Sequence, residues 1–103
     1  MRNFDYSKGC IYKIYCRDAK IKDIYVGSTC GFENRMISHI EHILYLGSKY
    51  PLGVHVFIRK NGGWNNWDMV KVEEFPCTDS KELRTRERFW KETLKATLNI
   101  NNP

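Results

Sequence analysis

The chain has 103 residues, 42% of them apolar and 14% aromatic, a composition that excludes a wholly disordered protein and leaves room for a single domain spanning residues 1–103. Its 17 lysine and arginine residues against 12 acidic ones give a net charge of +5, which suits a polyanionic partner but also serves solubility. The sequence starts without a leader pattern and contains no apolar run of about 18 residues, so we expect a soluble, intracellular protein with no membrane partner.

The first half of the chain predicts a β-hairpin followed by a helix. Residues 9–16 alternate in the strand period, which places on one face Cys10, Tyr12, Ile14 and Cys16. A polar connection leads to a second β-type run at residues 24–27, as is typical of an antiparallel hairpin with a loop longer than a tight turn. Ser28 and Thr29 are suited to cap a helix, and a helical pattern runs from about residue 32 to 46.

The second half predicts a helix, a strand and a further helix. A short helix that starts near residues 48–51 ends before a Gly-Gly pair, and a strand follows at residues 67–75. Asp79 and Glu82 resemble a capping box, which opens a last helix over residues 80–95. The predicted order is therefore β-β-α-α-β-α.

The cysteines and histidines do not predict a metal centre. No two cysteines have the spacing of a zinc-ligand pair, and a reducing compartment keeps thiols reduced, so we expect free cysteines. The residues concerned are Cys10, Cys16, Cys30, Cys77, His39, His42 and His55.

Two helical stripes carry charged or titratable side chains, and each has two interpretations. One stripe of the first predicted helix contains Arg35, His39 and His42, and a solvated helix flank is its simpler interpretation. On the last helix Glu87 shares a stripe with apolar residues, so its carboxylate must be ion-paired, protonated or bound to a metal. An ion pair with Arg84 or Arg88 is the structural alternative to a functional role.

Five features follow one another along the chain in a fixed order. The first motif is Gly9-Cys10-Ile11-Tyr12, with a cysteine in the slot after the glycine, and the second is Tyr25-Val26-Gly27. The remaining features are Arg35 and, one turn later, His39 on the first helix, Glu87 ahead of Phe89 and Trp90 on the last helix, and a terminal Asn99. Together these features resemble the signature of the GIY-YIG endonuclease family. The resemblance spans Gly9 to about Asn101, nearly the whole chain.

This resemblance implies an α+β fold with a central three-stranded antiparallel sheet flanked by helices, in agreement with the predicted element order. It also implies a metal-dependent endonuclease in which both tyrosines, Arg35 and Glu87 meet in a common groove. One Mg²⁺ or Mn²⁺ ion is expected on Glu87 as nearly its only protein ligand, with waters and a phosphate oxygen completing the site.

Given the resemblance, each site residue has an expected role. Tyr12 would accept the proton of the attacking water, which at neutral pH requires a nearby cation or the concerted loss of its own proton. Arg35 would neutralise charge on the scissile phosphate, and Tyr25 would orient the water or the phosphate. His39 would bond a tyrosine hydroxyl, and Asn99 would hold the site in shape.

The expected partner is DNA, duplex or branched, bound through phosphates rather than base edges. The length leaves no room for a sequence-reading module, so sequence preference should be low, or supplied by a partner or by a domain outside this sequence. One active site cuts one strand, so we expect a nicking monomer, with dimerisation on DNA as the route to a double-strand break. Two alternatives stay open: a binding module that retains the fold without the chemistry, and a basic domain for a protein partner. The basic residues expected at the phosphates are Lys13, Lys49, Arg59, Lys60, Arg86 and Arg88.

Overall fold

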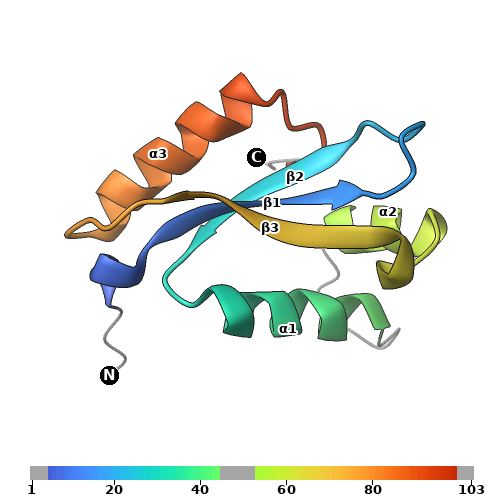
Figure 1. Cartoon of the computed structure of the whole chain (residues 1–103), viewed down its shortest axis with the longest axis horizontal. Coiled ribbons are helices and arrows are strands. Elements are labelled where there is room, and N and C mark those ends of the chain that lie inside the picture. Colours follow the sequence, from blue (N-terminus) through green and yellow to red (C-terminus); the bar gives the residue numbers. More distant parts are fainter. Residues whose placement is uncertain (1–4, 45–52, 100–103) are drawn as a thin grey trace.

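The three β-type segments of the sequence pair into one antiparallel sheet, and helices cover both of its faces (Figure 1). The structure is a computed structural model and describes residues 5–44 and 53–99. Its strands are β1 (Cys10–Cys16), β2 (Ile24–Thr29) and β3 (Trp67–Glu74), and its longer helices are α1 (Phe32–Leu44), α2 (Gly53–Lys60) and α3 (Ser80–Thr93). The predicted α+β class and element order are confirmed.

β1 is the middle strand of the sheet, whose order is β2-β1-β3. Ile11 and Tyr12 point to opposite faces, and both are fully buried. Tyr12 lies opposite Gly27 of β2, and Ile14 lies opposite Tyr25. The pairing of β1 with β3 shifts register between Ile11 and Tyr12. Such an irregularity bends a strand and re-aims the neighbouring side chains, and here it lies beside Tyr12.

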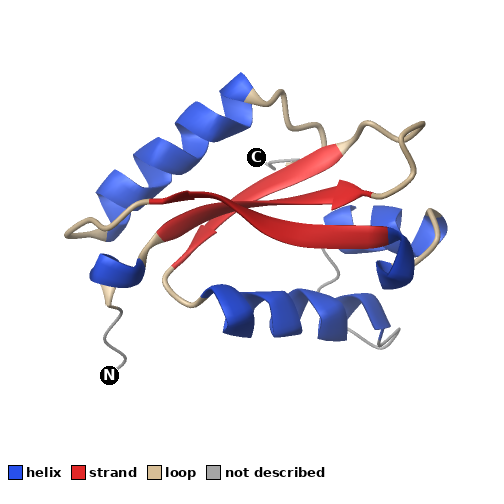
Figure 2. Ribbon diagram, viewed as in Figure 1, coloured by secondary structure: helices blue, strands red, loops and turns tan. Residues whose placement is uncertain are grey.

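The sheet lies between two helical layers (Figure 2). A hydrophobic core lies between the sheet and each of these layers. On the face covered by α1 and α2, Tyr12, Ile14 and Trp67 of the sheet pack against Ile43 and Ile58 of the helices. The core on the face covered by α3 is built from Ile11, Val26 and Leu83, with Trp90 and Leu94 packed against it. Alternate residues of β1 therefore serve different cores, as the strand period requires.

The start of α3 follows the predicted capping pattern, whereas a predicted cap of α1 does not form. Asp79 caps α3 by accepting a hydrogen bond from the Glu82 backbone N–H at 2.9 Å. The Glu82 carboxylate accepts from the N–H of Thr78, one residue earlier than a capping box requires. The expectation that Ser28 caps α1 is wrong, because Ser28 belongs to β2 and its hydroxyl donates to Glu87.

The observed boundaries agree with the predicted ones to within two residues wherever they can be compared. β3 covers residues 67–74 of the predicted 67–75, and α3 covers residues 80–93 of the predicted 80–95. The predicted end of the first helix at residue 46 and the predicted start of the next helix near residues 48–51 lie outside the described residues. Among the helices that the structure describes, none has the length and apolar character needed to cross a membrane.

The outer edge of β2 is closed by the segment that follows α3. Leu98 donates its N–H to the Ile24 carbonyl at 3.0 Å. The Asn99 side chain then pairs with the backbone of Val26: its Oδ1 accepts from the N–H at 2.8 Å, and its Nδ2 donates to the carbonyl at 2.6 Å. The backbone groups of an edge strand need partners, and the Asn99 amide supplies them in place of a further strand.

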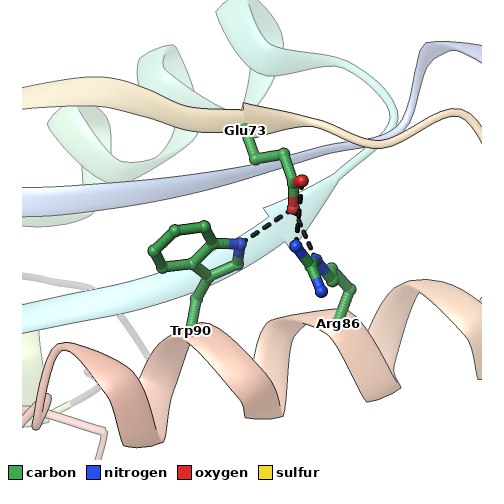
Figure 3. A network of polar contacts seen from close by, with 3 residues as sticks. All are labelled: Glu73, Arg86 and Trp90. Atoms are coloured by element: carbon green, nitrogen blue, oxygen red, sulfur yellow. Dashed lines mark hydrogen bonds and ion pairs between the residues drawn. The ribbon is translucent and has the colours of Figure 1, made fainter.

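A charged contact fastens α3 to β3 (Figure 3). Glu73 of β3 accepts two hydrogen bonds from Arg86, at 2.6 Å from Nε and 3.0 Å from Nη2, and a third from Trp90 Nε1 at 2.8 Å. The Arg86 guanidinium also lies 4.3 Å from the centroid of the Phe89 ring. These contacts fix the rotation of α3 about its axis, so that Glu87, the next residue along the helix, is directed toward β2.

Candidate active site

Tyr12 occupies the centre of the candidate site, with its side chain fully buried between the sheet and α1. The phenol leans over Gly27, where a Cβ atom would collide with its hydroxyl. The ring centroids of Tyr25 and His39 lie 6.3 Å and 5.8 Å from that of Tyr12. The Tyr12 hydroxyl is hydrogen-bonded to His39 Nε2 at 2.9 Å. The phenol therefore lies within direct hydrogen-bonding reach of an imidazole nitrogen.

The protonation of Tyr12 is decided by its burial. Burial raises the pKa of Tyr12 far above its usual value, and the nearby Tyr25 raises it further. The charge and hydrogen bonding of Arg35 lower this pKa but do not outweigh burial. Tyr12 is thus a neutral phenol at neutral pH, and it can accept a proton from water only as it loses its own.

Tyr25 lies on β2, half-buried beside Tyr12. Burial raises the pKa of Tyr25, the negative charge of Glu87 raises it further, and Arg35 acts in the opposite direction. Glu87 also contributes to the raised pKa of Tyr12. The carboxylate is therefore near both phenols, although Glu87 belongs to the helix on the other face of the sheet.

Ser28 links the two faces of the sheet at the edge of β2. Its hydroxyl donates to Glu87 Oε1 at 2.5 Å, and its backbone carbonyl accepts from Arg35 Nη1 at 3.4 Å. Glu87 comes from α3 and Arg35 from α1, the two layers that the sheet separates. The predicted site residues therefore meet around the edge of a strand, whereas the sequence analysis placed them in a groove without assigning its position in the fold.

The half-buried Glu87 carboxylate has no ion pair in the described part of the chain. Within residues 5–44 and 53–99, the ion pairs are Arg17 with Asp68 and Arg86 with Glu73. The structural alternative, an ion pair with Arg84 or Arg88, is therefore not found. An ionised carboxylate offers about four acceptor positions, and the hydrogen bond from Ser28 uses one, so Glu87 retains acceptor capacity for a ligand.

A cluster of three histidines lies behind Tyr12, and it includes His55, to which the sequence analysis gives no role. His39 Nδ1 is hydrogen-bonded to His55 Nε2 at 2.8 Å, and the His42 ring stacks on that of His55 with centroids 5.2 Å apart. Burial lowers the pKa of His39 to about 3 and that of His55 to about 4, with smaller contributions from neighbouring positive charges. The simpler interpretation of this helical stripe, a flank exposed to solvent, is correct for Arg35, which is exposed. It is wrong for His39, which is buried.

Asn99 contacts the site through the backbone of β2. Both atoms of its amide bond Val26, the residue between Tyr25 and Gly27. The amide thus fixes the segment that carries the second tyrosine and the glycine beneath Tyr12. This placement is compatible with the shaping role expected for Asn99.

Two of the arginines expected at DNA phosphates have partners within the fold. Arg86 is bound by Glu73, as described above. Arg59 is half-buried and donates from Nη2 to the His42 carbonyl at 3.3 Å. Both side chains therefore contribute to packing between elements, which makes them less available to a phosphate than an exposed lysine or arginine is.

The other basic residues expected at phosphates are more accessible. Lys60 and Arg88 are exposed, and Lys13 is half-exposed with its ammonium 5.4 Å from the Tyr15 ring centroid. Lys49 lies outside the described residues. Lys13, Lys60 and Arg88 are thus the members of the predicted set that are free to meet a polyanion.

Comparison with known proteins assigns the family. A family model described as the GIY-YIG catalytic domain matches residues 8–101. The chain belongs to the GIY-YIG family. Among solved structures it is similar to the catalytic domain of the homing endonuclease I-TevI, with 26% sequence identity, a TM-score of 0.72, and coverage of 92% of this chain and 100% of that chain. No curated protein sequence matches significantly.

Membership of the GIY-YIG family confirms that the chain is a nuclease domain, in agreement with the predicted class of enzyme. The two GIY-YIG motifs lie on the paired strands β1 and β2, and their pairing sets Tyr12 opposite Gly27. The tyrosines of the two motifs are thereby brought together at the same face of the sheet. A nuclease domain implies a DNA substrate.

GIY-YIG nucleases generally depend on a divalent metal ion, and the residues around Glu87 fit such an ion. No group of three or more His, Cys, Asp or Glu side chains in the described chain could hold a metal, so Glu87 would be the sole acidic ligand. Mg²⁺ is commonly bound by one or two carboxylates, with waters and substrate phosphates as the remaining ligands. The oxygen donors of Glu87 and DNA therefore suit a hard cation better than zinc.

Proposed function

We propose that this domain is a DNA endonuclease that cuts one strand by attack of a water in line with the leaving oxygen. The observation that carries the proposal is the convergence at Ser28, where Arg35 and Glu87 arrive from opposite faces of the sheet. Phosphodiester hydrolysis needs a cation for the phosphate and a carboxylate for a metal, and both groups meet here beside two phenols.

Arg35 is the proposed ligand of the scissile phosphate. Its side chain is exposed, and it donates a long hydrogen bond to the Ser28 carbonyl in addition to its contact with Tyr12. A planar guanidinium presents a fork of donors that matches phosphate oxygens. Because Arg35 also lowers the pKa of Tyr12 and Tyr25, the phosphate would bind beside the phenol that receives the proton.

Tyr12 is the proposed acceptor of the water proton, with His39 as the next acceptor. As the water oxygen bonds to phosphorus, its proton passes to the Tyr12 hydroxyl, and the original phenol proton passes to His39 Nε2, 2.9 Å away. The bond from phosphorus to the 3′ oxygen breaks with its electron pair, and solvent protonates that oxygen. Tyr25, which lies on the edge strand β2, would orient the water or the phosphate.

Glu87 is the proposed ligand of one Mg²⁺ or Mn²⁺ ion, which when bound would supply Lewis-acid stabilisation of the leaving 3′ oxygen. The hydrogen bond from Ser28 orients the carboxylate through Oε1 and leaves other acceptor positions for the ion. The contact between Glu73 and Arg86 supports this orientation by fixing the rotation of α3.

DNA would be held by phosphate contacts with Lys13, Lys60 and Arg88, none of which forms an ion pair with another described residue. Such contacts position a duplex or a branched substrate without reading bases, so we propose low intrinsic sequence specificity. A single site in one chain acts on a single strand, so nicking by a monomer is the proposed product pattern, and pairing of two copies on DNA would give a double-strand break.

The test replaces Glu87 with glutamine, which keeps an acceptor for Ser28 but removes the negative charge. The Glu87→Gln variant should lose at least about 100-fold in the rate of plasmid nicking with Mg²⁺, because metal stabilisation is worth several kcal/mol. Its melting temperature and its affinity for uncut DNA without metal should stay near the wild-type values. EDTA should stop the wild-type reaction.

The matched control is Glu92→Gln, which removes an exposed carboxylate from the same helix and should nick DNA at the wild-type rate. Equal nicking by Glu87→Gln and wild type would contradict the assignment of Glu87. If the wild type bound linear, branched and single-stranded DNA yet cut none of them with Mg²⁺ or Mn²⁺, the binding-only alternative would be correct.

A further inference from the structure

Three side chains from three elements form a buried hydrogen-bonded chain: Tyr12 of β1, His39 of α1 and His55 of α2. We propose that His55 is a positioning residue for hydrolysis, because its Nε2 holds the Nδ1–H of His39 and so keeps His39 Nε2 free to take the proton of Tyr12. This inference rests on the proposed function only for its effect on cleavage; the assigned positions of the protons are a property of the protein without DNA.

The direction of each hydrogen bond follows from what the groups can donate. The buried phenol of Tyr12 is neutral and has three polar neighbours: Arg35 only donates, whereas the Tyr25 hydroxyl and His39 Nε2 can each accept the phenol proton. We assign this proton to the bond with His39 Nε2, because an imidazole nitrogen is a stronger base than a phenol oxygen. A neutral imidazole carries one proton, so that of His39 must be on Nδ1. His39 Nδ1–H therefore donates to His55 Nε2, which leaves the proton of His55 on Nδ1.

His55, the third member of this hydrogen-bonded chain, has a feature that packing alone does not explain. His55 is only 2% exposed, and its Nδ1 has no hydrogen-bond partner among the described residues. An unpaired buried polar group costs about 1–3 kcal/mol, whereas an aliphatic side chain between Val54 and Val56 would pack without that cost. Keeping an imidazole here favours a role for its other nitrogen, the one bonded to His39.

His42 lies in the same cluster but outside the hydrogen-bonded chain. Its ring stacks on His55, while its Nδ1–H donates to the carbonyl of Ser38, within its own helix, at 2.7 Å. Removing the His42 imidazole changes the packing around His55 but none of the bonds that join Tyr12, His39 and His55. His42 is therefore the matched control for His55.

His55 acts when His39 becomes an imidazolium. The Tyr12 proton adds to His39 Nε2 while the Nδ1–H stays bonded to the lone pair of His55 Nε2, which stabilises the new positive charge in a site with little water. Without this acceptor, His39 is free to adopt the other neutral tautomer, with its proton on Nε2. That tautomer has no lone pair toward Tyr12 and cannot accept the phenol proton.

The test compares His55→Leu, His55→Gln and His42→Gln. Glutamine places its Oε1 as many bonds from Cα as histidine places Nε2, so it retains an acceptor for His39. We expect His55→Leu to lower kcat for DNA nicking at least about tenfold with KM near the wild-type value, since acid–base assistance contributes about 100-fold or more. His55→Gln should recover most of this loss, and His42→Gln should stay within about twofold of wild type.

Nitrogen-15 NMR of the imidazoles, without DNA or metal, reads the tautomer directly and does not depend on cleavage. The expected result is His39 protonated on Nδ1 in the wild type and in His42→Gln, with this tautomer lost in His55→Leu. His39 protonated on Nε2 in the wild type would overturn the proposal, as would a wild-type kcat in a folded His55→Leu variant. If the wild type cut no DNA, the NMR result would still decide whether His55 sets the tautomer.

Discussion

Tyr12 keeps its position because the residue opposite it across the β1–β2 pair is a glycine. The phenol lies over Gly27 and reaches His39, so the space that a side chain would fill is occupied by the proposed acceptor of the water proton. The second motif of the family therefore contributes in two ways: Tyr25 adds a second phenol, and Gly27 provides room for the first.

A methyl group at Gly27 should displace the phenol. Gly27→Ala is expected to lower the nicking rate at least about tenfold, because Tyr12 would leave the hydrogen bond to His39. It should also lower the unfolding free energy by about 1–3 kcal/mol through overpacking. Nicking assays and denaturant unfolding measure the two effects.

Gly31→Ala is the control for this prediction, since a Cβ at Gly31 would meet only the Asn34 side chain, at 3.9 Å. Its nicking rate and stability should be close to those of the wild type. If Gly27→Ala and Gly31→Ala behaved alike, the close fit of Tyr12 over Gly27 would not matter for activity.

The sequence predicted single site residues where they belong to a recognisable motif. It did not predict residues whose place in the site depends on a contact between distant elements. The tyrosines, Arg35, Glu87 and Asn99 each stand at a position of the sequence that resembles the family signature. His55 stands at no such position, because its importance arises from a contact with His39, 16 residues away on a different helix. Helical periodicity places a residue on a face but does not say which neighbour that face meets.

At the scale of secondary structure, two arginines of α3 have different surroundings: Arg86 attaches the helix to the sheet, and Arg88 faces solvent. Arg86 is bound by Glu73 and stacks on Phe89, whereas Arg88, two positions later, is exposed. The sequence could not separate these two residues, since both are arginines in one basic helix. The acceptor that distinguishes them, Glu73, comes from β3 and meets α3 only in the folded chain.

The two arginines should respond differently to the same substitution. Arg88→Gln should weaken DNA binding and reduce the slope of log affinity against log salt by about 1, because one phosphate contact is lost. Arg86→Gln should lower the melting temperature and leave that slope nearly unchanged, since its guanidinium is bound to Glu73. Salt-dependent binding and thermal unfolding of both variants provide the comparison, and the reverse pattern would refute the division of roles.

At the scale of the whole molecule, the site is assembled from both helical layers of one sheet. Arg35 and the histidines come from the α1–α2 side, Glu87 comes from α3, and Ser28 of β2 joins them. The order of elements was predictable, because strand and helix periods differ clearly along the chain. The assembly of the site around the edge of β2 was not predictable, because sequence periodicity does not show that a side chain from one face of the sheet reaches residues on the other face.

The buried imidazoles should make the fold sensitive to acid. The pKa of His39 is lowered to about 3 and that of His55 to about 4, against about 6.5 in the unfolded chain. Between these values the unfolded chain binds protons that the folded chain does not, so stability is full above about pH 6.5 and falls as the pH decreases. We expect each imidazole to contribute a loss of about 2 kcal/mol in the unfolding free energy between pH 7 and pH 5, about 4 kcal/mol for the two together.

Urea unfolding at several pH values measures this dependence. His55→Gln carries one buried imidazole fewer, so its stability should fall less steeply between pH 7 and pH 5 than that of the wild type. The carboxylates titrate alike in both proteins and cancel in the comparison. Equal slopes for the two proteins would show that His55 does not resist protonation in the folded state.

The amide of Asn99 has a consequence beyond the shape of the site. It occupies both backbone groups of Val26 that a neighbouring strand would need, and Leu98 occupies the carbonyl of Ile24. A second copy of the protein therefore finds a side chain where strand addition requires bare backbone, and the sheet cannot grow outward along this stretch of β2.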